Sequence, residues 1–196
     1  MNRLIATTFL AAIAWLCAFA AQAASVLPMY LDELADHAAI VFQAKCTGNR
    51  AQLDHELNTV VTYTTFEVRD VLKGDVAAVH EIKQIGGVLP SENLDRRVLG
   101  VPVFAEGEEY VVFLAGLSSA GFSSPLGLAQ GRFAVRPEGA SKRVGNGRDF
   151  RDTAGRMSEH LPPRARMRIA ESPMPVVDMD LEDFKQAVRN RIGSAR

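Results

Sequence analysis

The sequence has few cysteines, and this scarcity limits how the fold can be stabilised. It contains only Cys17 and Cys46, and Cys17 falls in an apolar N-terminal run that we expect to be removed. A mature chain with one thiol cannot form an internal disulfide, which excludes the disulfide-stapled class of small secreted domains. The core must therefore hold together by packing alone.

The chain also lacks an excess of either charge and several signatures of catalysis. It has 22 lysines and arginines against 23 aspartates and glutamates, a balance that gives no electrostatic reason to expect nucleic-acid binding. There is no HExxH, no GxSxG, no phosphate-binding glycine loop and no CxxC pair. Zinc peptidases, serine hydrolases, P-loop enzymes and dithiol oxidoreductases of the usual types thus have no support.

The first feature present is a secretory signal over residues 1–23. A positive start at Arg3 precedes an apolar run over residues 4–21, which closes on the small-residue cleavage pattern Ala21-Gln22-Ala23. An uncleaved membrane anchor is the alternative, because the run is nearly long enough to span a bilayer. The small-residue exit favours cleavage, so we expect a periplasmic or secreted protein with no integral membrane segment after cleavage.

The remaining pattern predicts a mainly β fold. A short helix is expected after Pro28, followed by five strands at about 40–47, 58–72, 79–85, 110–114 and 128–136. Residues 48–56 and 88–107 are expected to be loops, and Gly131 to sit mid-strand as a bulge or a barrel corner. Strands joined by turns rather than crossover helices favour a small antiparallel barrel or sandwich, and bends at glycine favour the barrel.

Past Pro137 the composition changes. We expect a barrel domain over residues 24–137, a basic Gly/Pro/Arg-rich linker or loosely packed arm over 138–177, and a C-terminal helix over 178–196. In that helix, Asp180 and Asp183 suit the positive N-terminus, and Phe184 belongs to an apolar stripe. The basic character of the arm comes from Arg143, Arg148, Arg151, Arg156, Arg164, Arg166 and Arg168.

Residues that could carry chemistry do not form a recognisable set. The four histidines, which are His37, His55, His80 and His160, are scattered without ligand spacing. Cys46 falls on the apolar face of its strand, where a thiolate is disfavoured, so we interpret it as a small buried hydrophobe. The acids Glu106, Glu108 and Glu109 bracket a turn and lack the spacing of a calcium loop, as do Asp180, Glu182 and Asp183. We therefore expect no catalytic residues, no cofactor and no metal site.

Residues 38–136 resemble uncharacterised exported bacterial domains with a netrin-like, or tissue-inhibitor-of-metalloproteinases-like, OB fold. The resemblance rests on an ordered series of weak motifs. These are Ala39-Ile-Val-Phe42, Thr64-Thr-Phe-Glu-Val68, Val71-Leu-Lys-Gly74, Gly86-Gly87, Gly100-Val-Pro-Val-Phe104, Gly107-Glu-Glu-Tyr110, Val112-Phe-Leu114 and Gln130-Gly-Arg-Phe133. It implies a five-stranded OB-like barrel, in agreement with the strand count, and a partner protein such as a secreted peptidase. The chain departs from the best-known inhibitors of this shape, because its expected mature start is Ala24-Ser25 and its one thiol is internal.

Three functional hypotheses follow. The first is an exported, non-enzymatic module that binds another protein through a concave face or through the loop at residues 88–105. The second is a thiol-dependent enzyme using Cys46, and the third is an envelope-associated structural protein held by the arginine arm. Nucleic acid is not expected as a partner: among outer-face aromatics only Tyr63 stands out, too little for a base-stacking platform.

Overall fold

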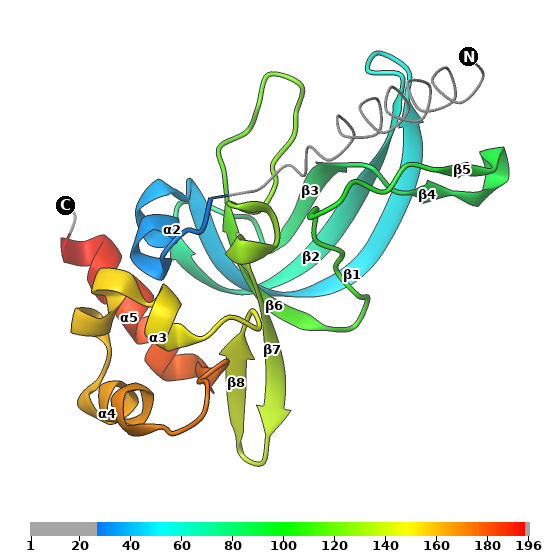
Figure 1. Cartoon of the computed structure of the whole chain (residues 1–196). Coiled ribbons are helices and arrows are strands. Elements are labelled where there is room, and N and C mark those ends of the chain that lie inside the picture. The colour runs from blue at the N-terminus through cyan, green and yellow to red at the C-terminus, as the bar shows by residue number, and fades with distance from the viewer. Residues whose placement is uncertain (1–26, 195–196) are drawn as a thin grey trace, which may run out of the picture.

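The computed structural model describes residues 27–194, so the signal predicted for residues 1–23 lies outside the described residues. The fold is mainly β and is built on a seven-stranded antiparallel sheet in the order β3-β2-β1-β6-β7-β8-β9 (Figure 1). Its strands are β1 (Ile40–Asp54), β2 (Thr59–Lys73), β3 (Val79–Ile85), β6 (Glu109–Leu114), β7 (Arg132–Glu138), β8 (Ser141–Gly145) and β9 (Met179–Asp180). A separate two-stranded sheet pairs β4 (Val88–Leu89) with β5 (Leu94–Asp95) around the short 3-10 helix η1 (Pro90–Glu92).

The predicted five-stranded barrel is wrong in two respects: the main sheet has more strands, and it does not close. β1 and β2 curve strongly, as a barrel would require (Figure 1). However, β6 continues through β7, β8 and β9 on the far side of β1, and β3 remains an edge strand. The extra strands come from residues beyond Pro137, which we had expected to lie outside the β domain.

Most predicted strands are confirmed, and the exceptions have physical reasons. Of the loop predicted over residues 48–56, residues 48–54 are instead the second half of β1, which pairs with β2 as far as Asp54 opposite Thr59, and residues 55 and 56 belong to the turn that follows. This half of β1 was predicted to be a loop because its side chains are polar. They are polar because the strand is partly open to solvent here, where Asn49 and Arg50 are exposed. Gly131 is not mid-strand but ends the 3-10 helix η2 (Leu128–Gly131), where an added Cβ would lie 2.9 Å from the carbonyl oxygen of Phe113.

Four helices gather on one side of the molecule against β6, β7 and β8 (Figure 1). They are α2 (Leu31–His37), α3 (Phe150–Thr153), α4 (Pro163–Glu171) and α5 (Leu181–Ser194). The short N-terminal helix and the C-terminal helix are thus confirmed. Phe184 of α5 is fully buried, with its ring centroid 5.0 Å from that of Phe133 and 6.2 Å from that of Phe113. These three aromatic rings belong to the first of two hydrophobic cores.

The basic arm expected over residues 138–177 is instead folded into this helical side. It contributes β8, α3, the 3-10 helix η3 (Gly155–His160) and α4. Val144, Phe150 and Met157 are each at most 1% exposed and belong to the first core. These apolar residues are spaced too widely to show a helical or strand period, so their burial was not apparent from the sequence pattern.

The second core lies on the same face of the curved half of the sheet as Thr64 and Gln84. Phe42, Phe66, Phe104 and Tyr110 pack edge to face, with ring centroids 4.9 to 5.7 Å apart. Cys46 is completely buried among them. Edge-to-face aromatic packing adds to the stabilisation from burial alone, and it gives the concave side of β1 and β2 a rigid floor.

Candidate functional site

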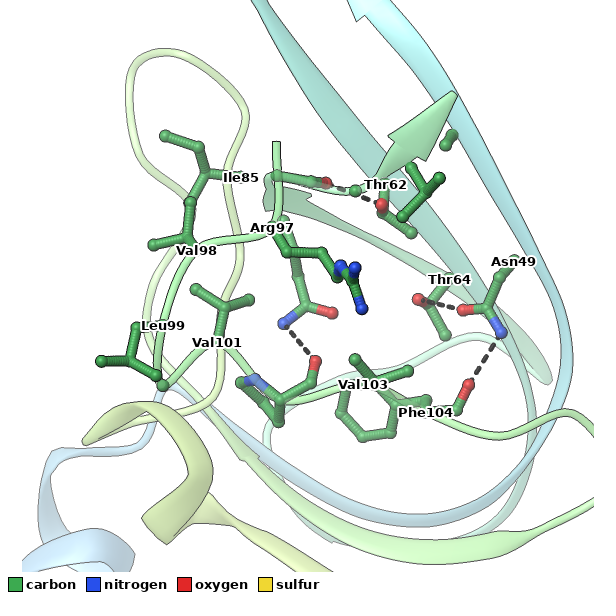
Figure 2. Close-up of a pocket in the computed structure, with 17 residues that line it drawn as sticks. Asn49, Thr62, Thr64, Ile85, Arg97, Val98, Leu99, Val101, Val103 and Phe104 are labelled. Carbon is green, nitrogen blue, oxygen red and sulfur yellow. Dashed lines mark hydrogen bonds between the residues drawn. The ribbon is translucent and has the colours of Figure 1, made fainter. Parts of the chain in front are cut away.

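A pocket of about 780 Å³ opens on the concave face of β1, β2 and β3 (Figure 2). The three strands supply its floor, and residues 97–104 cross in front of it as an extended loop. This loop falls within the 88–105 segment that the sequence indicated as a binding element. Pockets of this size are typical of small-molecule or peptide sites, so the pocket is the first candidate for function.

Polar side chains on the floor tie the loop to the sheet. Thr64 donates from Oγ1 to Asn49 Oδ1 at 2.7 Å, and Asn49 donates from Nδ2 to the carbonyl oxygen of Phe104 at 2.8 Å (Figure 2). Gln84 donates from Nε2 to the carbonyl oxygen of Pro102 at 3.3 Å. Thr64 and Gln84 are buried, and a buried polar group is costly unless it is hydrogen-bonded. These bonds therefore fix where the loop crosses the sheet.

One end of the pocket is formed by Gly86 and Gly87, where the chain leaves β3. Gly86 has φ +88° and Gly87 has φ +148°, values that favour glycine. Thr62 donates from Oγ1 to the carbonyl oxygen of Gly86 at 2.7 Å, and a Cβ on Gly87 would clash with the same hydroxyl. The glycine pair predicted as a bend therefore lets the backbone cross directly over the floor of the pocket.

The rim of the pocket is apolar and exposed. Leu99 is 96% exposed and Val103 is 74% exposed, although both side chains line the pocket. Ile85, Val88 and Val98 line it as well and are each 42% exposed. A cluster of exposed large apolar side chains around a hollow is typical of an interaction site, whereas such residues scattered singly are not informative.

Arg97 is the one ionisable side chain among the described residues that line the pocket. Its guanidinium group points toward the floor (Figure 2). The Nε of Arg97 donates a hydrogen bond to Asp95 Oδ1 at 3.0 Å. The hydrogen bond from Arg97 lowers the pKa of Asp95, and the same bond raises the pKa of Arg97. Asp95 itself does not line the pocket, so the pocket presents a guanidinium group whose charge is paired with an aspartate outside the lining.

Cys46 lies on the same face of the sheet as the pocket floor, next to the pocket but outside its lining. Its side chain is 0% exposed, and its Sγ lies 3.8 Å from the carbonyl oxygen of Phe104 and 3.7 Å from Asn49 Nδ2. Burial is the main cause of a raised pKa of the thiol. The predicted buried position is confirmed, and a thiol in this environment is poorly suited to act as a nucleophile.

The histidines do not converge. His37 and His55 are exposed, and His160 ends η3 on the helical side. His80 on β3 packs edge to face on Phe42 with centroids 5.3 Å apart; its Nε2 is buried without a partner among the described residues, and desolvation lowers its pKa. Within residues 27–194 no three His, Cys, Asp or Glu side chains are grouped closely enough to hold a metal ion.

The predicted acidic groups have structural partners. Glu106 accepts a hydrogen bond from the Asn49 backbone at 3.0 Å, and Glu109 contacts Lys142 at 2.6 Å. Asp180 accepts from the backbone of Glu182 and Asp183 at the start of α5, as predicted for a helix N-terminus.

Most arginines of the 138–177 segment also have partners. Arg143 binds Asp178 at 2.7 Å, Arg164 binds Asp183, and Arg156 binds Asp32 at 3.1 Å. Hydrogen bonds from Arg151 lower the pKa of Asp149 to about 2. Arg143, Arg156 and Arg164 thereby link separate segments of the helical side, and each has its charge paired with an aspartate.

The residues that build the pocket were only partly visible in the sequence. Thr62 and Thr64 belong to the strand predicted at about 58–72, and both line the pocket. Asn49 and Ala51 were missed because they were placed in a loop. The signal that could have found them is the alternation of Asn49, Ala51 and Leu53 continuing that of Ala44 and Cys46 across a one-residue bulge.

Comparisons with known proteins do not identify a relative: no family model and no curated protein matches the chain. None of the helices within residues 27–194 combines the length and apolar character needed to cross a membrane.

Proposed function

We propose that this protein is an exported, non-enzymatic binding module that recognises another exported protein through the pocket between the concave sheet face and residues 97–104. The observation that carries the proposal is the combination of an apolar exposed rim with a hydrogen-bonded floor in one hollow. Such sites bind by burying apolar surface, while a few placed polar groups orient the ligand.

The chemistry of the pocket favours binding over catalysis. Arg97 is the one ionisable residue in its lining among the described residues, so no acid–base pair faces a bound molecule there. Cys46 is buried in the core next to the pocket, outside its lining, with a raised pKa. A general acid–base or thiol mechanism needs such groups within hydrogen-bond reach of the substrate. The resemblance to inhibitor-like OB domains adds a secreted peptidase as one class of partner.

The envelope-associated alternative has less support. It requires free arginines in residues 138–177, whereas Arg143, Arg156 and Arg164 are engaged with aspartates. Ion pairs within the fold leave less charge for an anionic surface.

Affinity capture from the exported fraction of the source organism tests the proposal. The wild-type chain would be compared with a pocket variant, Leu99→Glu with Val103→Glu, and with a matched variant, Leu117→Glu with Met167→Glu, whose positions are also exposed but lie outside the pocket. We expect at least one exported protein to bind the wild type and the matched variant and to be lost from the pocket variant. Equal recovery on all three would contradict the proposal.

A further inference from the structure

The second half of β1 has a free edge beside the pocket. β1 pairs with β2 along Val41–Asp54 but with β6 only along Ile40–Lys45. Gly86 N–H donates to the carbonyl oxygen of Val60, so the backbone groups of Val60 point toward β3. Because these groups point to opposite sides at successive strand residues, the N–H and C=O groups of even-numbered β2 residues point toward β3 and those of odd-numbered residues point toward β1. On β1, Arg50 and Gln52 therefore bond to β2, while the backbone groups of Asn49 and Ala51 point away from it.

The contacts of this edge agree with that alternation. Asn49 N–H, which faces the edge, donates to the carboxylate of Glu106 at 3.0 Å. Within residues 27–194 no group bonds the N–H or C=O of Ala51. Unpaired backbone groups on a sheet edge are a template for an added strand, and an extended peptide that adds to such an edge places alternate side chains on one face. Here that face is the pocket, because the side chains of Asn49 and Ala51 line it.

Both ends of the pocket along β1 are bridged. At one end, the bond from Asn49 Nδ2 to the carbonyl oxygen of Phe104 ties the loop to the strand. At the other end, Gly87 lies over Ala51, so close that an added Cβ would sit 3.5 Å from the Ala51 Cβ. A continuous segment lying on this face would have to pass beneath one of the bridges, whereas a chain end fits between them.

The polar groups that line the pocket favour one of the two chain ends. No carboxylate belongs to the described lining, so an N-terminal ammonium group would have no counter-ion there. Arg97 faces the pocket and uses Nε and Nη2 toward Asp95, which leaves Nη1 to donate to a ligand. Hydrogen bonds between a guanidinium and a carboxylate are among the strongest in proteins.

We propose that the pocket binds the free C-terminus of a partner protein, as an extended apolar segment that adds to the edge of β1 at Ala51 with its terminal carboxylate on Arg97. This inference rests on the proposed function and specifies its ligand. The backbone of Ala51 would supply the strand-like hydrogen bonds. The exposed side chains of Val98, Leu99 and Val103 would cover the apolar residues of the segment.

Fluorescence anisotropy with two labelled hexapeptide pools tests the inference. Both pools carry Val, Leu, Ile or Ala at the last four positions; one ends in a free carboxylate and the other in an amide. We expect the carboxylate pool to bind about tenfold more tightly than the amide pool, and Arg97→Gln to remove that preference. Arg96→Gln is the matched control, since Arg96 is exposed and does not line the pocket, and it should leave binding unchanged.

A backbone substitution tests the strand addition separately. Ala51→Pro removes an N–H that makes no bond to β2, so the fold should persist, and a thermal melt confirms this. Glu81→Pro is the control, because the backbone groups of Glu81 face the opposite, outer edge of the sheet on β3 and Glu81 lies outside the pocket lining. Ala51→Pro should abolish binding of the carboxylate pool, and Glu81→Pro should not.

Other outcomes separate the two proposals. Equal binding of the two peptide pools, or tighter binding of a long-chain fatty acid that displaces them, would overturn the C-terminal ligand. If neither pool binds while the Leu99/Val103 variant still loses an exported partner, the binding function stands and this inference fails. If the pools bind but no partner is lost, the proposed partner class fails and the pocket chemistry stands.

Discussion

At the scale of single residues, burial decides what the ionisable and reactive groups can do. Cys46 has the position of a core residue: it faces Phe66 across the ladder and is closed off by Phe104. His80 lies on the same curved half of the sheet, with Phe42 against its ring. Both groups are held in their neutral forms, because desolvation raises the pKa of the thiol and lowers the pKa of the imidazole.

The thiol of Cys46 should react slowly in the folded protein. In the chain without residues 1–23, where Cys46 is the single thiol, we expect labelling by a water-soluble disulfide reagent at neutral pH to be roughly a hundredfold or more slower than in urea. A Cys46→Ala, Met167→Cys variant is the control, because position 167 is exposed, and it should react at the unfolded rate. Rapid labelling of the folded wild type would contradict the buried position of the thiol and support the hypothesis of a thiol-dependent enzyme.

His80 should make stability depend on pH in a defined direction. Its folded-state pKa lies below the ordinary 6.5 because of desolvation, so the unfolded chain binds the proton more readily. The stabilising contribution is complete above pH 6.5 and is lost as the pH falls from there through the folded pKa. We expect His80→Phe to show a smaller decrease in the free energy of unfolding between pH 7 and pH 5 than the wild type. Identical pH profiles in urea melts would contradict this assignment.

At the scale of elements, strands in which apolar and polar residues alternate regularly could be predicted from the sequence. Segments whose buried residues are widely spaced could not. The strand at 79–85 is confirmed at both ends. The exposed side chains of Val79, Glu81 and Ile85 alternate with the more buried His80, Ile82 and Gln84, and Gly86 follows the last strand residue. β1 was predicted to stop early because residues 48–56 are polar, and the bulge between Cys46 and Gly48 hides the continued strand by shifting its alternation by one residue.

The segment 138–177 was misjudged for a different reason. Phe150 and Met157 are single apolar anchors between polar residues, and only tertiary contacts with α5 show that they are buried. The pocket could not be predicted in detail, because its lining joins β1, β2 and β3 to a loop far away in the sequence.

Phe150 tests whether this segment belongs to the folded unit. Its ring stacks on Phe133 and contacts Phe184, and it is 1% exposed. We expect Phe150→Ala to lower the free energy of unfolding by about 3–5 kcal/mol, measured by urea denaturation. Met167→Ala in the same segment should change it by less than about 0.5 kcal/mol, because Met167 is exposed. A similarly small effect at Phe150 would indicate the loosely packed arm that the composition suggested.

At the scale of the whole molecule, the two hydrophobic cores stabilise different parts of the fold. One core packs four helices on β6, β7 and β8, while the other supports the curved half of β1, β2 and β3. The loop at residues 97–104 is held to that curved half mainly by side-chain bonds from Asn49 and Gln84. The molecule thus combines a firmly packed body with a pocket whose front wall carries exposed apolar residues, which is the arrangement expected of a binding module.

Site-specific photo-crosslinking in the source organism tests this account most directly. A photoreactive amino acid placed at Val103, on the pocket rim, should form a covalent adduct with an exported protein, and the added Ala51→Pro substitution should remove it. The same amino acid at Met167, which is exposed but distant from the pocket lining, should give no adduct with that protein. Adducts of equal yield at both positions, or none at Val103 in cells that fold and export the protein, would contradict the claim that this pocket is where the protein binds its partner.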